Sequence, residues 1–361
     1  MISRKILAAG LSGLAMAAAG PGSAWALNST ELTVTGNVAT PGTYTAAVLA
    51  TLTQSSVTAT YNGPGGSVTD SYTGVSMWNL LNAAGGVVTN PAVKNEILRD
   101  VVVATGTDGY AAAFALGEID PSFGNRPYLI ATSDNFGQVG SGPDGFTRVV
   151  VPGDTAGGRY VSNLDNLNVV QAPTVPVSGT GGISSQFTLS GNVKTTETLT
   201  LAALQALPAS TESATYKAGG TPVTDIYTGV SLWSLLNSDG LLTDPKIKND
   251  ILRDFVLVTG SDGYEAVISL GEIDPAFGDQ PDLVAYADTL GQLGVGGVDG
   301  FARLVVPGDI AGGRYVSNIV SLAVIDATGV PEPLGWAMLL TMAAGLFGVS
   351  VVGRRGVRNP V

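Results

Sequence analysis

The sequence predicts an α+β fold that occurs twice in tandem. Residues 72–78 recur as residues 227–233, at an offset of 155, and 17 of the 26 residues in 99–124 are identical in 253–278. Residues 145–163 recur as 300–318, with 16 of 19 identical. A period of about 155 residues has the length of a whole domain. Within each copy, alternating patterns typical of strands are interspersed with short helical patterns, and this mixture indicates an α+β domain.

Each copy is expected to begin with a strand. Apolar and polar residues alternate over residues 32–38 and again over 187–193. Later in the second copy, residues 260–263 form a Gly-Ser-Asp-Gly turn signal between two apolar segments, 255–258 and 264–270. These two segments are therefore predicted to be consecutive strands of one sheet.

Two short helices are predicted in the second copy. Residues 200–207 have helical spacing, and Pro208 should end that helix because proline lacks a backbone N–H. Residues 230–237 form the second helix, with Trp233 on its apolar face. Trp78 has the same place in the first copy, and we expect both tryptophans to pack into cores rather than to form a platform for a ligand.

The repeats define the domain boundaries. We predict domains over residues 28–170 and 184–327. The segment between them, residues 171–183, is rich in Pro, Gly, Ser and Thr, which is typical of a linker, and its prolines should keep it partly extended.

The N-terminus has the layout of a secretory signal peptide over residues 1–26. Arg4 and Lys5 precede an uncharged run rich in Ala and Leu, and the small-residue pattern that follows predicts cleavage after Ala26. A retained membrane helix is the alternative, but the apolar run is shorter than the ~20 residues that a span needs. The Sec export machinery and signal peptidase are the expected partners of this segment.

The C-terminus combines three features in a fixed order. An uncharged stretch over residues 334–353 just suffices to cross a hydrocarbon core of about 30 Å at 1.5 Å per residue. A basic cluster behind it should remain cytoplasmic, which leaves the repeats on the outer side. A buried core helix is the alternative, but it would rarely be followed by a basic tail at the end of a chain. The flanking residues are Pro331, Glu332 and Pro333 before the span, and Arg354, Arg355 and Arg358 behind it.

This order over residues 330–361 resembles the PEP-CTERM sorting signal of Gram-negative bacteria. The resemblance implies that an exosortase-type membrane protease removes the tail during delivery to the cell surface or exopolysaccharide. It also implies that the span anchors the chain in the inner membrane at least transiently. The expected location is therefore the periplasm, or the cell surface and extracellular matrix.

Composition excludes several classes of function. The formal net charge is −12 and becomes −16 for residues 27–330, with 12 basic and 28 acidic residues, so binding to nucleic-acid phosphates is not expected. The chain has no Cys and no His. Thiolate metal sites, cysteine nucleophiles, the Ser-His-Asp triad and the usual zinc sites are therefore excluded. Gly and Pro total 68 of 361 residues, which indicates many turns in a folded protein.

Three segments of the second copy carry a further resemblance. They are Tyr-Thr-Gly-Val-Ser-Leu-Trp-Ser-Leu-Leu at 227–236, Gly-Ser-Asp-Gly-Tyr with Ser-Leu-Gly-Glu-Ile-Asp-Pro within 260–275, and Leu-Val-Val-Pro-Gly-Asp with Gly-Gly-Arg-Tyr-Val within 304–316. Together with their partners in the first copy, they resemble the oxidoreductase molybdopterin-binding superfamily, the domain type of sulfite oxidase. Catalytic members bind molybdenum through a cysteine thiolate, which this chain lacks. The resemblance thus implies the fold without the cofactor.

Candidate residues for binding a pterin or another anion follow from this resemblance. One arginine precedes each Pro-Gly-Asp turn and one follows each Gly-Gly pair. Burial of the first arginine against the turn carboxylate, Asp154 or Asp309, is the favoured alternative for Arg148 and Arg303. For the Asp-Gly turns, simple turn chemistry is the favoured alternative. The candidates are Arg148, Arg159, Arg303, Arg314, Asp108 and Asp262.

Two further sets of carboxylates are considered. Glu118 with Asp120, and Glu272 with Asp274, resemble paired-carboxylate sites, although acids in the first turn of a helix are the favoured interpretation. A calcium site is considered at a flexible loop that contains Asp134, Asn135 and Asp144. We assign no catalytic residue and expect no metal or other cofactor.

The expected function is a non-catalytic structural or ligand-binding module on a degenerate molybdopterin-domain fold, exported and associated with exopolysaccharide or other surface proteins. One alternative is a molybdopterin-type oxidoreductase in which an Asp or Ser oxygen replaces the thiolate. Another is a calcium-dependent matrix protein, which calcium should stabilise against heat.

Overall fold

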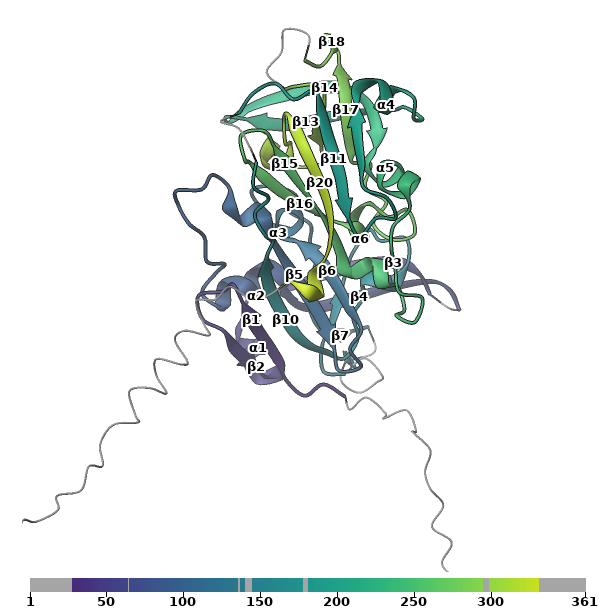
Figure 1. Cartoon of the computed structure of the whole chain (residues 1–361). Coiled ribbons are helices and arrows are strands. Elements are labelled where there is room, and N and C mark those ends of the chain that lie inside the picture. The colour runs from purple at the N-terminus through teal and green to yellow at the C-terminus, as the bar shows by residue number, and fades with distance from the viewer. Residues whose placement is uncertain are drawn as a thin grey trace, which may run out of the picture.

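The computed structural model describes residues 28–330 except 64, 136, 140–144, 178–180 and 295–298 (Figure 1). We call residues 28–170 the first repeat and 184–327 the second repeat. The predicted signal peptide with Ala26, and the predicted sorting signal from residue 331 onward with its span over 334–353, lie outside the described residues. No helix within the described part is long and apolar enough to cross a membrane.

The first repeat consists of two five-stranded sheets and short helices. One sheet has the order β2 (Gly42–Tyr44), β1 (Leu32–Gly36), β10 (Leu164–Gln171), β5 (Asp100–Gly106) and β6 (Ala111–Ala115). The other has the order β3 (Gln54–Gly63), β4 (Gly66–Ser76), β7 (Leu129–Asp134) and β8 (Gly137–Gln138), with β9 (Arg148–Val150) also paired to β7.

The second repeat has the same arrangement. One sheet has the order β12 (Glu197–Thr200), β11 (Gln186–Gly191), β20 (Ile319–Asp326), β15 (Asp254–Gly260) and β16 (Glu265–Ser269). The other has β13 (Ser210–Ala218), β14 (Thr221–Ser231), β17 (Leu283–Asp288) and β18 (Gly291–Gln292), with β19 (Arg303–Val305) on β17. The opening strands and the strand pair around residues 260–263 are thus confirmed.

Only one strand pair in each repeat is parallel among the pairs described, β1 with β10 and β11 with β20. This pairing brings the start of each repeat against its end. The backbones approach closely at Gly36, where a Cβ atom would lie 2.1 Å from the carbonyl oxygen of Val169. Gly36 also has φ +79°, so glycine is required there for two reasons.

The helices are short, and four of the α-helices described are capped by a hydroxyl side chain. The predicted helix over 200–207 is confirmed as α4 (Leu201–Gln205), with the Thr200 hydroxyl accepting from a backbone N–H of its first turn. The helix predicted from residue 230 begins two residues later, as α5 (Leu232–Asp239). The reason is that β14 continues to Ser231, whose hydroxyl then serves as the N-cap. The remaining α-helices are α1 (Ala46–Thr51), α2 (Met77–Ala83), α3 (Leu116–Ile119) and α6 (Leu270–Ile273).

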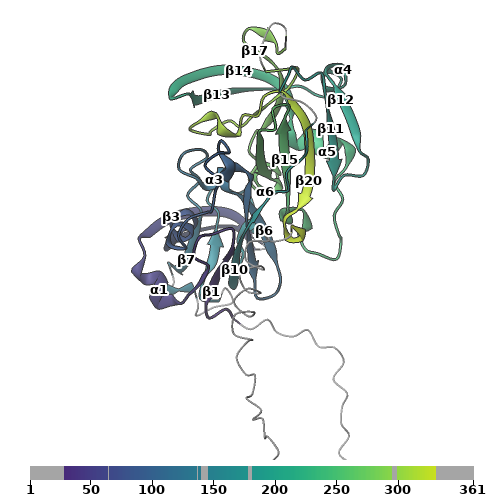
Figure 2. The same cartoon turned by 60° about the vertical axis from the view of Figure 1, so that its left-hand side comes forward.

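The two repeats pack against each other as two lobes, with β6, α3 and α6 near their junction (Figures 1 and 2). Each lobe has its own apolar core, but the core of the second repeat includes Leu98 and Phe123 of the first. Reciprocally, the core of the first repeat includes Leu252 and Phe277 of the second. A third apolar cluster joins β5 and β6 to β15 and β16. The repeats therefore form one packed body.

The segment expected to be a linker begins within that junction. Gln171 is the last residue of β10, and Ala172 is buried. The Val175 N–H donates to the carboxylate of Glu265 at 2.8 Å, and Val175 packs on the apolar cluster between the repeats. Residues 171–175 are thus held by the body of the protein.

Candidate functional site

Reciprocal hydrogen bonds between the two repeats hold the side chains around the candidate site in place. The Asn95 side chain donates to the Tyr264 hydroxyl at 2.9 Å, and Asn249 donates to the Tyr110 hydroxyl at the same distance. Each tyrosine in turn donates to a backbone carbonyl of its own repeat, at 2.5 Å. Because corresponding residues exchange the same contacts, the two repeats are related by an approximate two-fold axis, as in an isologous dimer.

Glycines let the aromatic rings cross this interface. A Cβ atom at Gly313 would lie 2.2 Å from the Phe123 ring, and one at Gly158 would lie 2.1 Å from the Phe277 ring. The backbone next to Phe123 is also fixed, since its carbonyl accepts from the N–H of Ile310 at 2.8 Å. The second glycine of each Gly-Gly pair is therefore explained by close packing of the partner repeat, whereas the first packs against a tyrosine of its own repeat.

Arg159 lies in a buried network at the junction. Its guanidinium donates to both oxygens of Asp154, at 2.9 and 2.6 Å, and to Glu118 at 2.5 Å. The Tyr128 hydroxyl donates to Glu118, and Ser269 of the second repeat donates to the same carboxylate at 3.1 Å. Burial raises the pKa of Asp154, although the guanidinium lowers it in part. All three nitrogens of the Arg159 guanidinium thus donate inside the protein.

Arg314 forms the matching network in the second repeat, with one difference. It donates to Asp309 at 2.9 and 2.6 Å and to Glu272 at 2.8 Å. Asp282 occupies the position of Tyr128, and neither of its carboxylate oxygens has a hydrogen-bond partner among the described residues, although its exposed fraction is only 1%. Burial raises the pKa of Asp282 well above its usual range and that of Glu272 to about 7.

These networks change the interpretation of the sequence. Glu118 does lie in the first turn of α3, as expected, but its buried carboxylate pairs with an arginine instead of facing solvent. Asp120 caps a turn by accepting from the Ser122 N–H at 2.7 Å. The expected pairing of Arg148 and Arg303 with the turn carboxylates is wrong, because the helical turn after each Pro-Gly-Asp returns the later arginine onto that carboxylate.

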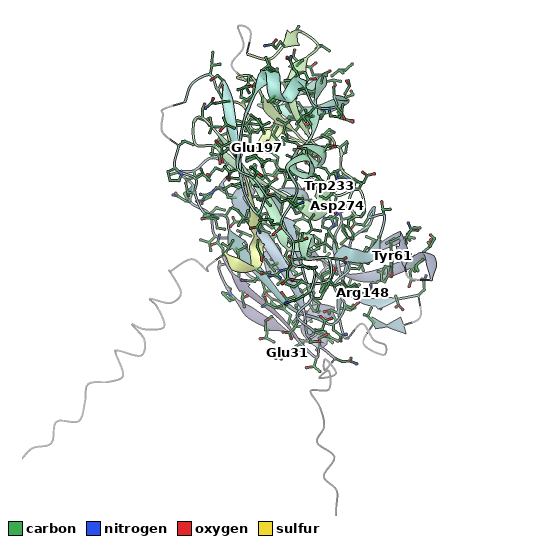
Figure 3. The ribbon with its side chains drawn as sticks, turned by 45° about the vertical axis from the view of Figure 1, so that its right-hand side comes forward. Glu31, Tyr61, Arg148, Glu197, Trp233 and Asp274 are labelled. Carbon is green, nitrogen blue, oxygen red and sulfur yellow. The ribbon has the colours of Figure 1, made fainter. Side chains whose placement is uncertain are left out.

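The remaining arginine candidates lie beside aromatic rings. Arg148 lies over the ring of Tyr72 at 5.8 Å and over that of Tyr160 at 5.7 Å, and is labelled in Figure 3. Arg303 lies over the corresponding rings of the second repeat and pairs with Asp299 at 3.0 Å. A sequence search for ion pairs could not find these contacts, because strand pairing within one sheet and the turn after each Gly-Gly pair bring the rings to the arginine.

The Asp-Gly turns have the predicted geometry. Asp108 and Asp262 each accept from the N–H two residues later, at 3.0 Å, and the intervening glycines have φ +80°. Asp262 also borders the cavity described below.

The calcium candidates are only partly within the structure. Asp134 ends β7 and Asn135 follows it, whereas Asp144 lies outside the described residues. No group of three or more carboxylates in the described ranges is placed to hold a metal ion.

The tryptophans differ in their surroundings. Trp78 packs on the core of the first repeat, as expected. Trp233 packs on the core of the second repeat and also borders a cavity of about 510 Å³, together with Asp274 and Lys194. Trp233 and Asp274 lie close together in Figure 3.

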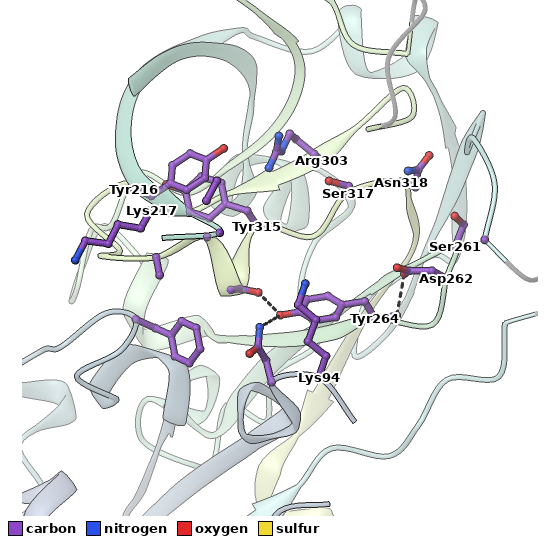
Figure 4. Close-up of a pocket in the computed structure, with 18 of the residues that line it drawn as sticks. Lys94, Tyr216, Lys217, Ser261, Asp262, Tyr264, Arg303, Tyr315, Ser317 and Asn318 are labelled. Atoms are coloured by element: carbon purple, nitrogen blue, oxygen red, sulfur yellow. Dashed lines mark hydrogen bonds between the residues drawn. The ribbon is translucent and has the colours of Figure 1, made fainter. Parts of the chain in front are cut away.

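A larger cavity of about 990 Å³ lies where the second repeat meets the first, and we call it the junction cavity (Figure 4). Its volume is at the upper end of the roughly 300–1,000 Å³ of small-molecule sites. Lys94, Asn95 and Phe123 of the first repeat border it, and the second repeat contributes Lys217, Arg303 and three tyrosines, Tyr216, Tyr264 and Tyr315. Its lining has three cations against one acid, Asp262, in a chain of net charge −12.

The residues described do not fit a molybdenum-bearing pterin. The chain has no cysteine, and Glu118 and Glu272 of the buried networks pair with arginines. Arg159 and Arg314, two of the four arginine candidates for holding a pterin or its phosphate, are 1% and 0% exposed and donate to carboxylates. We therefore derive no redox step for this site.

Comparisons with known proteins give distant likenesses among solved structures only. No protein-family model matches the chain, and no curated protein is similar to it in sequence. Among solved structures, the sulfane dehydrogenase SoxCD from Paracoccus pantotrophus matches with a TM-score of 0.33 and 13% identity, over 80% of this chain and 77% of that one. A likeness this distant does not identify what the chain binds or catalyses.

Proposed function

We propose that the chain is an exported, non-catalytic protein of the cell surface or exopolysaccharide, in which the two repeats together form a ligand-binding module. The ligand site is the junction cavity. The observation that carries this proposal is the positively charged, tyrosine-lined cavity in a strongly acidic chain. A concave site with aromatic walls and a few polar groups is the usual form of a small-molecule site.

Two further observations support binding rather than redox chemistry. The chain lacks the thiolate ligand of the family that it resembles, and two of the four arginine candidates, Arg159 and Arg314, are engaged in buried ion pairs. The reciprocal interface fixes the walls of the cavity before any ligand arrives. A preorganised site loses less conformational entropy when a ligand binds, which favours a binding role.

The proposed route to the surface rests on the two ends of the sequence. The Sec machinery, signal peptidase and an exosortase-type protease are the proposed partners, with exopolysaccharide or other surface proteins at the destination. Mass spectrometry of protein recovered from the native envelope tests this route. We expect a chain that begins at Leu27 and lacks the C-terminal span, and recovery of the unprocessed chain from the cytoplasm would overturn the proposal.

The binding role is tested by what the native protein contains. We expect neither molybdenum in elemental analysis nor pterin in fluorescence of protein purified from its own envelope. Stoichiometric molybdenum or pterin would instead support the oxidoreductase alternative. A melting temperature that rises at millimolar calcium would support the calcium alternative.

A further inference from the structure

We propose that Asp282 makes the junction cavity sensitive to pH. While its carboxyl group is protonated, Arg314 holds one wall of the cavity in place, and ionisation of Asp282 loosens that wall. We call residues 309–315 the cavity wall. The inference rests on the proposed function for the role of the cavity as the ligand site, and it adds how that site is regulated.

Asp282 lies inside the protein without a partner for its side chain. Its exposed fraction is 1%, and neither carboxylate oxygen accepts a hydrogen bond within the part of the chain that the structure describes. The backbone there is fixed, because the Asp282 carbonyl accepts from the Leu232 N–H at 2.7 Å. Burial of an ionised carboxylate without a partner is strongly unfavourable, so this position favours the neutral acid.

The first repeat has a neutral donor at the same position. Tyr128 corresponds to Asp282, and its hydroxyl donates to the buried carboxylate of Glu118. The first network thus holds two carboxylates, Glu118 and Asp154, against the guanidinium of Arg159. A protonated Asp282 leaves the second network with the same charge, whereas an ionised Asp282 adds one negative charge to it.

The cations near Asp282 are already engaged. The charged groups that act on its carboxyl group are Glu272 of α6, Arg314 and Asp309 of the cavity wall, and Arg126 of the segment between α3 and β7. Arg314 donates from all three guanidinium nitrogens, to Asp309 at 2.9 and 2.6 Å and to Glu272 at 2.8 Å. Arg126, which comes from the first repeat, donates to Gln280. An ionised Asp282 therefore competes with Asp309 and Glu272 for Arg314. Burial and the negative charge of Glu272 both raise the pKa of Asp282.

Arg314 connects this competition to the cavity. Its two carboxylate partners are Asp309 in the cavity wall and Glu272 in α6, so its side chain ties the wall to the body of the second repeat. The residues of the cavity wall that border the junction cavity are Ala311, Gly312, Gly313 and Tyr315. The Ile310 N–H also donates to the carbonyl of Phe123, which borders the cavity from the first repeat. Loss of an Arg314 ion pair thus loosens the cavity wall together with its contact to the first repeat.

Hydrogen exchange of the purified protein between pH 6 and pH 8, followed by mass spectrometry, tests this inference. Opening of the cavity wall lets Asp282 release its proton, so each pH unit should favour opening by about tenfold. We therefore expect the protection factors of residues 309–315, corrected for the intrinsic exchange rate, to fall by about tenfold per pH unit. Residues 154–160 are the internal control, because Tyr128 stands in place of the acid there, and their protection should fall by less than about threefold per pH unit.

Asp282→Asn keeps the shape of the protonated acid and cannot ionise. Protection of residues 309–315 should then fall by less than about threefold per pH unit, whereas Asp165→Asn, which changes the charge of an exposed residue of β10, should retain the wild-type fall. Three results would overturn the inference: equal falls in residues 309–315 and 154–160 of the wild type, an unchanged fall in Asp282→Asn, or protection of residues 309–315 equal to that of β1 and β11 at every pH. The last result would show unfolding of the whole protein instead of opening of the cavity wall.

The comparison within the wild type can overturn the inference by itself, so the test stands even where Asp282→Asn does not fold. No ligand takes part in it, and the binding function is judged separately by the molybdenum and pterin content of the native protein. Either proposal can therefore fail alone.

Discussion

Asp100 should make the protein less stable as the pH rises from 5 to 7.5. Its side chain is fully buried, and one oxygen accepts from the Asn37 amide at 3.0 Å. Burial raises the pKa of Asp100 to about 8, although the Asn37 hydrogen bond lowers it in part. The folded protein therefore keeps a proton that the unfolded chain, with a pKa of about 3.9, has already released.

The sign and size of the effect follow from this difference in proton binding. Stability gained from a raised pKa is fully present below pH 4 and is lost as the pH rises toward 8. A single proton changes the free energy of unfolding by about 1.36 kcal/mol per pH unit. Over 2.5 units the loss from Asp100 is about 3 kcal/mol.

Asp100→Asn isolates this contribution. The amide has nearly the shape of the protonated acid and does not titrate, so the variant should lose about 1.36 kcal/mol per pH unit of the downward slope. Urea unfolding followed by tryptophan fluorescence at pH 5, 6, 7 and 7.5 measures the slope. Asp165→Asn is the control, since Asp165 is exposed on β10 and the charge change is the same.

The test compares how steeply the stability of the two variants falls with pH. Asp254, the counterpart of Asp100 in the second repeat, has a pKa raised by burial to about 7 and keeps some slope in every variant. The expected result is a shallower slope in Asp100→Asn than in Asp165→Asn. Equal slopes, or a wild-type protein whose stability rises from pH 5 to 7.5, would refute the reasoning.

Three further predictions concern the junction of the repeats. Arg314→Met should lower the free energy of unfolding by about 3–5 kcal/mol in urea, because it leaves buried carboxylates uncompensated, and a loss below 1 kcal/mol would contradict the network. Asp282→Asn should raise the melting temperature at pH 7.5 and leave it unchanged at pH 4. The reason is that burial raises the pKa of Asp282, so that folding takes up a proton at pH 7.5 in the wild type only. A gain in melting temperature at both pH values would argue against titration as the cause. Gly313→Ala should lower the free energy of unfolding by about 2 kcal/mol, because the added methyl group overpacks against Phe123. Gly329→Ala is the control and should be neutral, since its Cβ would meet nothing within 4 Å. Similar melting temperatures of the two variants would contradict the close packing.

Much of each repeat could be predicted because its signals are local. The alternation over residues 187–193 depends on one face of a strand being buried, and the structure places β11 there. The helix that starts after Thr200 was predictable from its spacing and from Pro208. The start of α5 was missed by two residues, because pairing of β14 with β17 extends the strand to Ser231.

The partners of the arginines could not be predicted in the same way. Both arginines of each repeat lie near the same Pro-Gly-Asp turn in the sequence, and spacing alone favoured the wrong one. Arg159 reaches Asp154 because the backbone turns through a 3-10 helix (Gly157–Arg159), and Glu118 approaches from a distant segment. The Ser269 hydroxyl on Glu118 comes from the other repeat, 151 residues away.

The sequence by itself determined the duplication, the acidic charge, the absence of thiol and imidazole chemistry, and the patterns at both ends of the chain. These properties need no knowledge of distance. Only the tertiary structure decided that the repeats exchange aromatic residues across an approximate two-fold axis and that Lys94 of one repeat borders a cavity of the other. The physical reason is that a binding site is defined by the positions of side chains in space, and the packing of one repeat on the other sets these positions.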